Sequence, residues 1–158
     1  MENKTNNTKD REISLSRTLN APIDLVWEIC TQPAHIANWW GPDGFTNTIH
    51  LMEFHTGGRW HFIMHGPDGT DYDNKNVFTE IVEQRKIVFD HVSEPRHTTT
   101  IEFVPHGEKT LLTWHMLFES VEQFIEVAKK YGAVEGLQQN VKKLESYLSK
   151  QGFNAYFH

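Results

Sequence analysis

Residues 37–45 read ANWWGPDGF, which places Trp39 and Trp40 side by side directly before a turn. Adjacent side chains point in different directions on a helix and to opposite faces on a strand, so one packing surface cannot take both rings. We expect one ring to anchor a short helix in the core. The other is expected at the mouth of a cavity, where GPDG turns the chain back into a sheet. Anchoring of both rings in the core is the alternative.

The segments on both sides of this stretch predict an α+β domain. Ile13 and Leu15 alternate with polar residues, which is typical of a strand, and Pro22 suits the first position of a following helix. Residues 33–40 read as a second short helix. Six strand-like segments follow in hairpin order between residues 46 and 118, and GPDG recurs as a turn at 66–69. We find no alternation of strands and helices of the kind that builds a parallel sheet.

The last third of the chain predicts a long amphipathic helix. Apolar residues recur every three or four positions from residue 120 to about 150, and Ser120 with Gln123 resembles a capping box. Gly132 and Gly136 predict a break or kink near residue 132. The expected fold is a curved antiparallel sheet of about seven strands wrapped on this helix. A straight helix touches a curved sheet unevenly, so side chains or a ligand must fill the gap.

The length of 158 residues fits one domain. Residues 1–10 are polar and are predicted to form a disordered tail, and residues 11–150 form the expected domain. Residues 151–158, QGFNAYFH, are expected to be an aromatic tail that folds back onto the surface or frays.

Composition argues against several classes of partner. The formal net charge is −6 without a cluster of Lys and Arg, which disfavours nucleic acid and anionic membranes. No segment approaches the ~20 apolar residues that a membrane span needs, and the first ten residues do not resemble a signal peptide. The single cysteine, Cys30, lies in an apolar helical pattern and is interpreted as an inert core residue. A reducing cytoplasm is the expected location.

Several ordered motifs resemble the Hsp90 ATPase activator homologue-like family, a member of the START-like (SRPBCC, Bet v-like) superfamily of helix-grip folds. They are LNAPIDLVWEICTQPAHIANWW, WWGPDGF, GGRWHFIMHGPDG, EIVEQRKIVF and GAVEGLQQNVKKLESYL. The resemblance covers about residues 12–150.

The resemblance implies an apolar cavity between the sheet and the C-terminal helix. It implies binding of a small hydrophobic or amphipathic ligand of the lipid, sterol or polyketide class, by a monomer or weak homodimer. Two alternatives stay open. The first is a stress-response protein that associates with a chaperone, and the second is a cyclase, dehydratase or hydrolase that acts in the same cavity.

Strand parity indicates which side chains line this cavity, because alternate residues of a strand share one face. Trp60, Phe62 and Met64 form a uniformly apolar face, and the later strands repeat the pattern. An ordinary hydrophobic core is the alternative for each of these residues. The expected lining comprises Trp39, Trp40, Trp60, Phe62, Met64, Phe89, His91, Ile101, Phe103, Leu112, Trp114, Met116, Phe124, Val134, Leu137 and Val141.

The sequence offers no motif for a metal, a cofactor or a catalytic nucleophile. His61 and His65 would lie ~13 Å apart on a strand, too far to share an ion. No nucleophile elbow, phosphate loop or dinucleotide fingerprint is present. Polar strand residues that could orient a bound carbonyl or hydroxyl, or else are ordinary strand residues, are Tyr72, Glu80, Asp90, His91, Glu102 and His115.

Overall fold

The computed structural model describes residues 8–157, and it describes their side chains except at positions 130, 131 and 152–157. Residues 1–7 of the expected disordered tail therefore lie outside the described residues, and a short 3-10 helix, Lys9–Arg11, follows them. The strands are β1 Glu12–Leu19, β2 Thr46–Met52, β3 Arg59–His65, β4 Asp71–Val82, β5 Lys86–His91, β6 His97–His106 and β7 Lys109–Phe118. The helices are α1 Ile23–Thr31, α2 Pro33–Ile36, α3 Val121–Tyr131 and α4 Ala133–Phe157.

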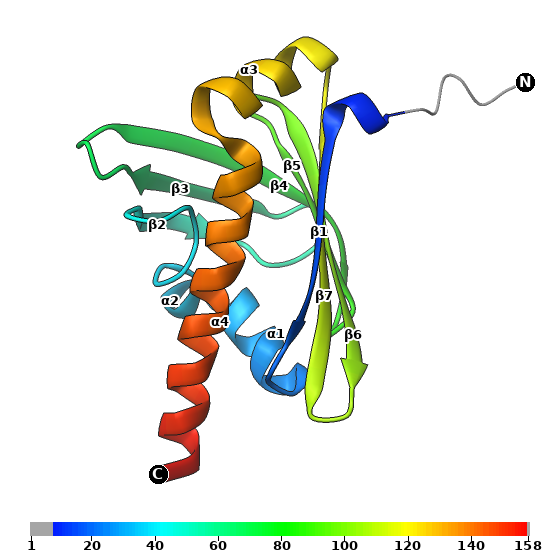
Figure 1. Ribbon diagram of the computed structural model, residues 1–158, viewed down its shortest axis with the longest axis vertical. Coiled ribbons are helices and arrows are strands. Elements are labelled where there is room, and N and C mark those ends of the chain that lie inside the picture. Colours follow the sequence, from blue (N-terminus) through cyan, green and yellow to red (C-terminus); the bar gives the residue numbers. More distant parts are fainter. Residues whose placement is uncertain (1–7, 158) are drawn as a thin grey trace, which may run out of the picture.

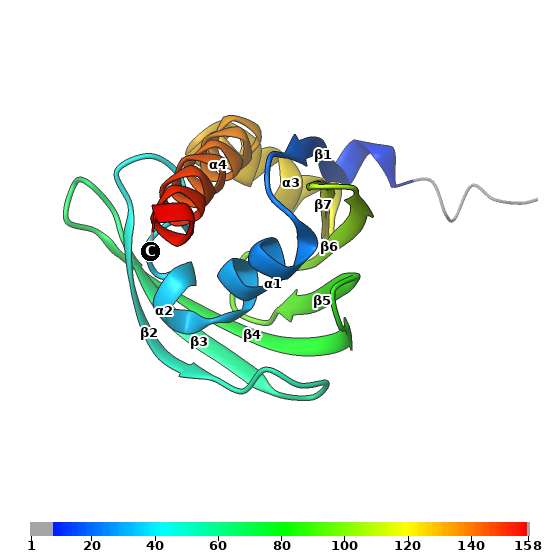
Figure 2. The ribbon, with the colours of Figure 1, turned by 90° about the horizontal axis from the view of Figure 1, so that it is seen from below.

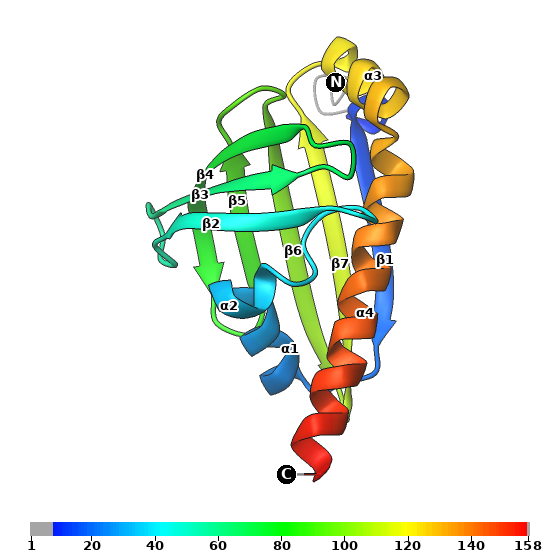
Figure 3. The ribbon, with the colours of Figure 1, turned by 90° about the vertical axis from the view of Figure 1, so that its left-hand side faces the viewer.

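All seven strands form one antiparallel sheet in the order β1-β7-β6-β5-β4-β3-β2. Strands β2 to β7 therefore pair in hairpin order, as predicted, and β1 closes the series against β7. The sheet curls strongly, and α4 lies across its open side (Figures 1 and 2). Figures 1 and 3 show α1 and α2 level with the middle of this helix and α3 at its N-terminal end. The α+β class and the helix-grip arrangement are confirmed.

The two short helices after β1 differ in detail from the expectation. Pro22 caps α1 instead of occupying its first turn, and α2 ends at Ile36, before the tryptophan pair. Trp39 and Trp40 consequently lie in the irregular segment between α2 and β2. Because this segment is not part of a helix or strand, its backbone groups need partners from elsewhere in the molecule.

The break in the C-terminal helix lies at Gly132, where the sequence predicts it. Ser120 Oγ accepts a hydrogen bond of 3.1 Å from the backbone N–H of Gln123, which caps α3. Gly132 ends α3 in a left-handed conformation with a φ of 58°. Helix α4 then continues through Phe157, so the expectation that the chain leaves the helix after residue 150 is wrong.

The core lies between the concave face of the sheet and the buried face of α4. On β3, Trp60 and Phe62 are buried, whereas Arg59 on the opposite face is exposed, as strand parity predicts. Helix α4 contributes buried side chains at intervals of three or four residues, which is the spacing of one helical face. These side chains are Leu137, Asn140, Val141, Leu144 and Leu148.

Two glycines allow the turn after the tryptophan pair to approach its neighbours. Gly41 has a φ of 98°, and a Cβ atom there would lie 2.8 Å from Met64 Cε. A Cβ at Gly136, on α4, would make an ordinary contact of 3.4 Å with Pro42 Cγ. The first glycine is thus required by backbone conformation and by space, whereas the second is not.

We predict that Gly41→Ala lowers the free energy of unfolding by about 1–3 kcal/mol, because it forces an L-residue into a strained conformation. The matched change Gly136→Ala is expected to raise it by about 0.5–1 kcal/mol, since alanine favours the helix interior. Urea unfolding monitored by circular dichroism measures both. An equal loss in the two variants would contradict the distinction between these positions.

Candidate ligand-binding site

The two adjacent tryptophans occupy different environments. Trp39 is 1% exposed, and its indole Nε1 donates a hydrogen bond of 3.1 Å to the backbone oxygen of Ile29 in α1. Its own backbone oxygen accepts a hydrogen bond of 2.9 Å from Asn140 Nδ2 on α4. Trp39 therefore anchors the segment to α1 and to α4.

Trp40 is only partly buried, although aromatic rings surround it. Its neighbours come from three strands and from the adjacent residue, and several are in edge-to-face or tilted contact, which favours aromatic pairs. The ring centroids lie 4.9 Å away for Trp60, 5.2 Å for Trp114, 5.5 Å for Trp39, 6.1 Å for Phe62 and 6.3 Å for Phe89. We call these six residues the ring cluster. Trp40 fills its centre from a segment that is neither strand nor helix.

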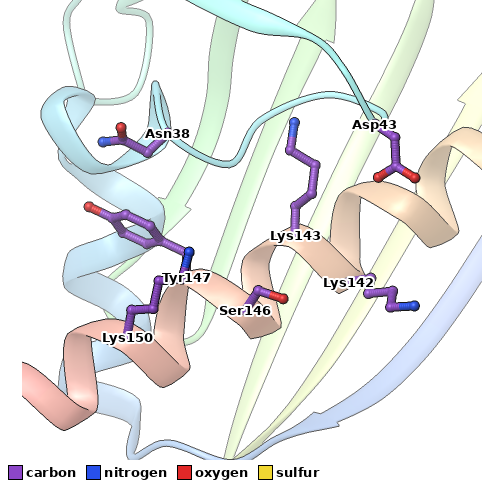
Figure 4. A pocket seen from close by; sticks show the side chains of 7 residues that line it. All are labelled: Asn38, Asp43, Lys142, Lys143, Ser146, Tyr147 and Lys150. Carbon is purple, nitrogen blue, oxygen red and sulfur yellow. The ribbon is translucent and has the colours of Figure 1, made fainter.

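Helix α4 holds the turn that follows Trp40. Lys143 Nζ donates hydrogen bonds of 3.1 Å to the backbone oxygen of Pro42 and 3.3 Å to that of Phe45. Gln139 Oε1 accepts a hydrogen bond of 3.1 Å from the backbone N–H of Asp43. Burial lowers the pKa of the Lys143 ammonium. Figure 4 shows Lys143 pointing from α4 toward this turn, whereas Lys142 points away from it. We call these three hydrogen bonds the loop clamp.

Two hollows open on the described surface near this region. One, of about 310 Å³, lies beside the loop clamp between Asn38 and Lys150 (Figure 4). The other, of about 810 Å³, lies beside α1 and is lined by Trp27, Met52 and Phe54 among others. Neither is lined by a residue of the ring cluster. The side chains of the ring cluster belong to the hydrophobic core or pack against it.

The apolar lining gives way to a polar row near α3. Trp60 on β3, Asn76 on β4, His91 on β5 and His97 on β6 are consecutive register partners across the sheet. Phe118 on β7 ends the row, and its ring stacks on His97 at a centroid distance of 5.2 Å. We call the first four residues the polar row.

Both histidines of the polar row are held in a desolvated environment. His91 Nδ1 lies 2.9 Å from the backbone oxygen of Pro95, and Nε2 lies 2.8 Å from Asn74 Oδ1. Burial lowers the pKa of His91, and it lowers the pKa of His97 to about 3, to which the neighbouring His91 also contributes. The two rings lie 4.7 Å apart. At neutral pH both imidazoles are therefore uncharged.

The remaining expected lining residues are only partly brought together. Ile101, Phe103, Leu112, Leu137 and Val141 are buried in the same core, whereas Met64, Met116 and Phe124 are partly buried. Val134 is 39% exposed, because it lies in the first turn of α4 at the corner with α3. Its expected place in the lining is therefore wrong.

Most other polar candidates lie away from the concave face. Glu80 and Glu102 are exposed, and Asp90 accepts a hydrogen bond of 2.7 Å from Thr98 Oγ1. His115 Nε2 lies 2.9 Å from Glu12 Oε1, beside the edge strand. Tyr72 is partly buried, and its ring lies 5.9 Å from that of Phe45.

Cys30 is buried in α1. Burial raises the pKa of the Cys30 thiol, which favours the unreactive protonated form, in agreement with an inert core cysteine. Within residues 8–157, no group of three His, Cys, Asp or Glu side chains comes close enough to hold a metal ion. In the same range, no helix is long and apolar enough to cross a membrane.

The sequence reasoning missed Asn74, Asn76 and His97. The signal that could have found them is the strand parity that located the apolar lining. Asn74 and Asn76 alternate in phase with the buried Phe78, and His97 alternates in phase with the buried Ile101 and Phe103. Polar residues on an otherwise apolar strand face mark places where a buried group needs a partner.

Comparison with known proteins places this chain and its fold in a family. The family model described as Activator of Hsp90 ATPase homolog 1-like protein matches residues 20–149. A solution structure of a protein from Arthrobacter aurescens is similar with a TM-score of 0.83 and 28% identity, over 91% of this chain and 89% of that one. A crystal structure from Nitrosomonas europaea is similar with a TM-score of 0.80 and 22% identity, over 90% and 97%. None of the curated proteins compared with the chain matches it significantly.

We predict that Lys143→Met loosens the loop clamp. Two backbone oxygens lose their charged donor, so the free energy of unfolding should fall by about 1–2 kcal/mol. Amide hydrogen exchange of residues 41–45 should accelerate about tenfold. The matched control is Lys142→Met, which removes an exposed ammonium from the preceding position of the same helix. Equal exchange rates in both variants would show that the clamp does not hold the turn.

We further predict that His97 makes the fold sensitive to acid. Its native pKa of about 3 lies below the value of 6.5 expected in the unfolded chain, so the unfolded state binds more protons between these pH values. Its contribution to stability is complete above pH 6.5 and is lost as pH falls, by at most about 1.4 kcal/mol per pH unit.

Urea unfolding between pH 7.5 and 4.5 should thus show a shallower loss of stability in His97→Phe than in the wild type, whatever the absolute stability of the variant. His106→Gln, at an exposed position of the β6–β7 hairpin, controls for the loss of one histidine. The same slope in wild type and His97→Phe would contradict a buried, neutral His97.

Proposed function

We propose that this protein binds one small apolar or amphipathic molecule between the sheet and α4. The chain belongs to the family of Activator of Hsp90 ATPase homolog 1-like proteins and has the helix-grip fold. A ligand of the lipid, sterol or polyketide class fits the aromatic character of this region. The protein would then act as a carrier, a sensor or a sequestering protein.

The observation that carries the proposal is the position of Trp40. Its ring fills the centre of the ring cluster, but its backbone lies in an irregular segment. This segment is held by a backbone hydrogen bond of 3.0 Å from Trp40 N–H to the oxygen of Ile36 and by side chains of β2 and α4. Such segments open at lower free energy than strands or helices do. Withdrawal of this one side chain would uncover apolar walls on β3, β5 and β7 without breaking a strand pairing.

The walls that Trp40 would leave behind suit an apolar guest. Trp60, Phe62, Phe89 and Trp114 are each at most 3% exposed. Met64 and Met116 lie beside them and are only partly buried, and their flexible thioether side chains can adapt to different shapes. A site with mostly apolar walls and few polar groups is typical of small-molecule pockets.

Release of the loop clamp supplies a route for the ligand. The turn that contains Pro42 and Phe45 continues directly from Trp40, so the ring can leave only if this turn moves away from α4. The hollow beside Asn38 and Lys150 lies along the same seam between turn and helix. The ligand would therefore enter between α4 and the segment after α2.

The proposal predicts that the wild-type protein binds N-phenyl-1-naphthylamine, a neutral apolar fluorophore, and that a fatty acid, a sterol or an aromatic polyketide displaces it. Binding should change tryptophan emission, and Trp40→Phe should remove most of that change because Trp40 is the ring that moves. Trp27→Phe is the matched control, since Trp27 contacts Phe54 and Phe103 outside the ring cluster.

A second variant tests whether the wild type has a binding site or whether a site arises only when the Trp40 side chain is removed. Trp40→Ala should bind the fluorophore about tenfold more tightly than the wild type, because the ligand no longer competes with the ring. Binding by Trp40→Ala together with no binding by the wild type across the whole panel would overturn the proposal. In that case Trp40 would be an ordinary core residue, and no ligand would take its place.

A further inference from the structure

Three buried polar atoms of the polar row have no hydrogen-bond partner among the described residues: Trp60 Nε1, Asn76 Oδ1 and His97 Nδ1. Trp60 and Asn76 are 2% and 1% exposed, and within the described residues neither Trp60 Nε1 nor Asn76 Oδ1 has a hydrogen-bond partner. The other polar atom of Asn76, Nδ2, donates to the backbone oxygen of Trp60 at 3.2 Å, which fixes the direction of the amide. A buried donor or acceptor that stays unpaired costs about 1–3 kcal/mol, so folded proteins rarely keep one without a reason.

Trp60 Nε1 and Asn76 Oδ1 are complementary atoms of two paired residues. Trp60 and Asn76 are direct register partners on β3 and β4, so their Cα atoms are roughly 4.5–5.5 Å apart and their side chains share one face of the sheet. The indole Nε1 can only donate a hydrogen bond, whereas the amide Oδ1 can only accept one. Trp60 also belongs to the ring cluster, and its ring centroid lies 4.9 Å from that of Trp40. Trp60 therefore borders the space that Trp40 occupies.

The surroundings of the pair carry no charge that would match an ionised ligand. The polar row consists of an indole, an amide and two imidazoles, and burial keeps both imidazoles neutral at pH 7. The Lys143 ammonium, which holds the clamped turn, gives its hydrogen bonds to Pro42 and Phe45. A carboxylate placed at the pair would lose its water without gaining a cation, which is costly.

We infer that Trp60 and Asn76 bind a hydroxyl group at the polar end of an amphipathic ligand whose apolar body takes the place of Trp40. A hydroxyl accepts from Trp60 Nε1 and donates to Asn76 Oδ1, so it satisfies both atoms at once. A carboxylate offers no proton to Asn76, and an ammonium offers no lone pair to Trp60. This inference rests on the proposed function and adds the chemical class of the ligand's polar end.

The test compares three ligands of one chain length by displacement of N-phenyl-1-naphthylamine at pH 8. These are 1-decanol, its methyl ether, which can accept but not donate, and decanoate, which is ionised at this pH. We expect 1-decanol to bind about tenfold more tightly than the ether, since one hydrogen bond to a buried acceptor separates these two ligands. Decanoate should bind more weakly than either.

Two variants test whether Trp60 and Asn76 cause the preference for 1-decanol. Trp60→Phe keeps an aromatic ring but removes the donor, and Asn76→Leu keeps a similar size but removes the acceptor. Asn76→Leu should remove the advantage of 1-decanol over its methyl ether, whereas Trp60→Phe should weaken 1-decanol and the ether alike, each by about five- to tenfold. Trp27→Phe is the control for the loss of an indole elsewhere. If Asn76→Leu fails to fold, Trp60→Phe and the ether comparison still decide the question.

The outcomes distinguish this inference from the function on which it rests. If the wild type does not bind the fluorophore or any of the three ligands, the proposed function fails. If the fluorophore binds but 1-decanol has no advantage over the ether, or Asn76→Leu leaves that advantage intact, the hydroxyl site is overturned. Internal water would then be the partner of the two atoms.

Discussion

The structure depends on how the segment with the two tryptophans is held between the sheet and α4. Successive side chains cannot enter the same surface, so Trp39 reaches α1 while Trp40 reaches the concave face of the sheet. The backbone of this segment needs hydrogen-bond partners, and Asn47 on β2 supplies one to the oxygen of Trp40. Asn140 and Lys143 on α4 supply them to Trp39 and to the following turn. The helix thus covers the core and fixes the segment that fills its centre.

The curvature of the sheet determines which side chains meet under this cover. Consecutive strands bring residues that are far apart in sequence into rows across the concave face, and these rows change character along the strands. The row of Trp114 and Ile101 is apolar, whereas the row of Asn76, His91 and His97 is polar. An apolar centre with a polar end is the arrangement that an amphipathic molecule requires. The aromatic ring of Trp60 belongs to both regions.

The fold could be predicted from the sequence because its signals are periodic. Alternation placed the strand faces, spacings of three and four residues placed α4, and Gly132 placed its beginning. The end of α4 and the exposure of Val134 depend on how the helix is positioned relative to the sheet, which periodicity does not specify. The polar row was missed for a related reason. Parity shows that Asn76 faces inward, but only the three-dimensional arrangement shows that its Oδ1 has no partner.

The energetic cost of opening the site lies in the aromatic contacts more than in the loop clamp. The oxygens of Pro42 and Phe45 would exchange Lys143 for water, and such an exchange changes the free energy by only about 1 kcal/mol per hydrogen bond. Moving Trp40 out of its five ring contacts exposes apolar surface, and only a guest that buries a comparable area can offset that loss. Burial of area alone would accept any hydrocarbon of suitable size. On this proposal, selection among such guests comes from Trp60 Nε1 and Asn76 Oδ1, since the apolar walls make no distinction between polar ends.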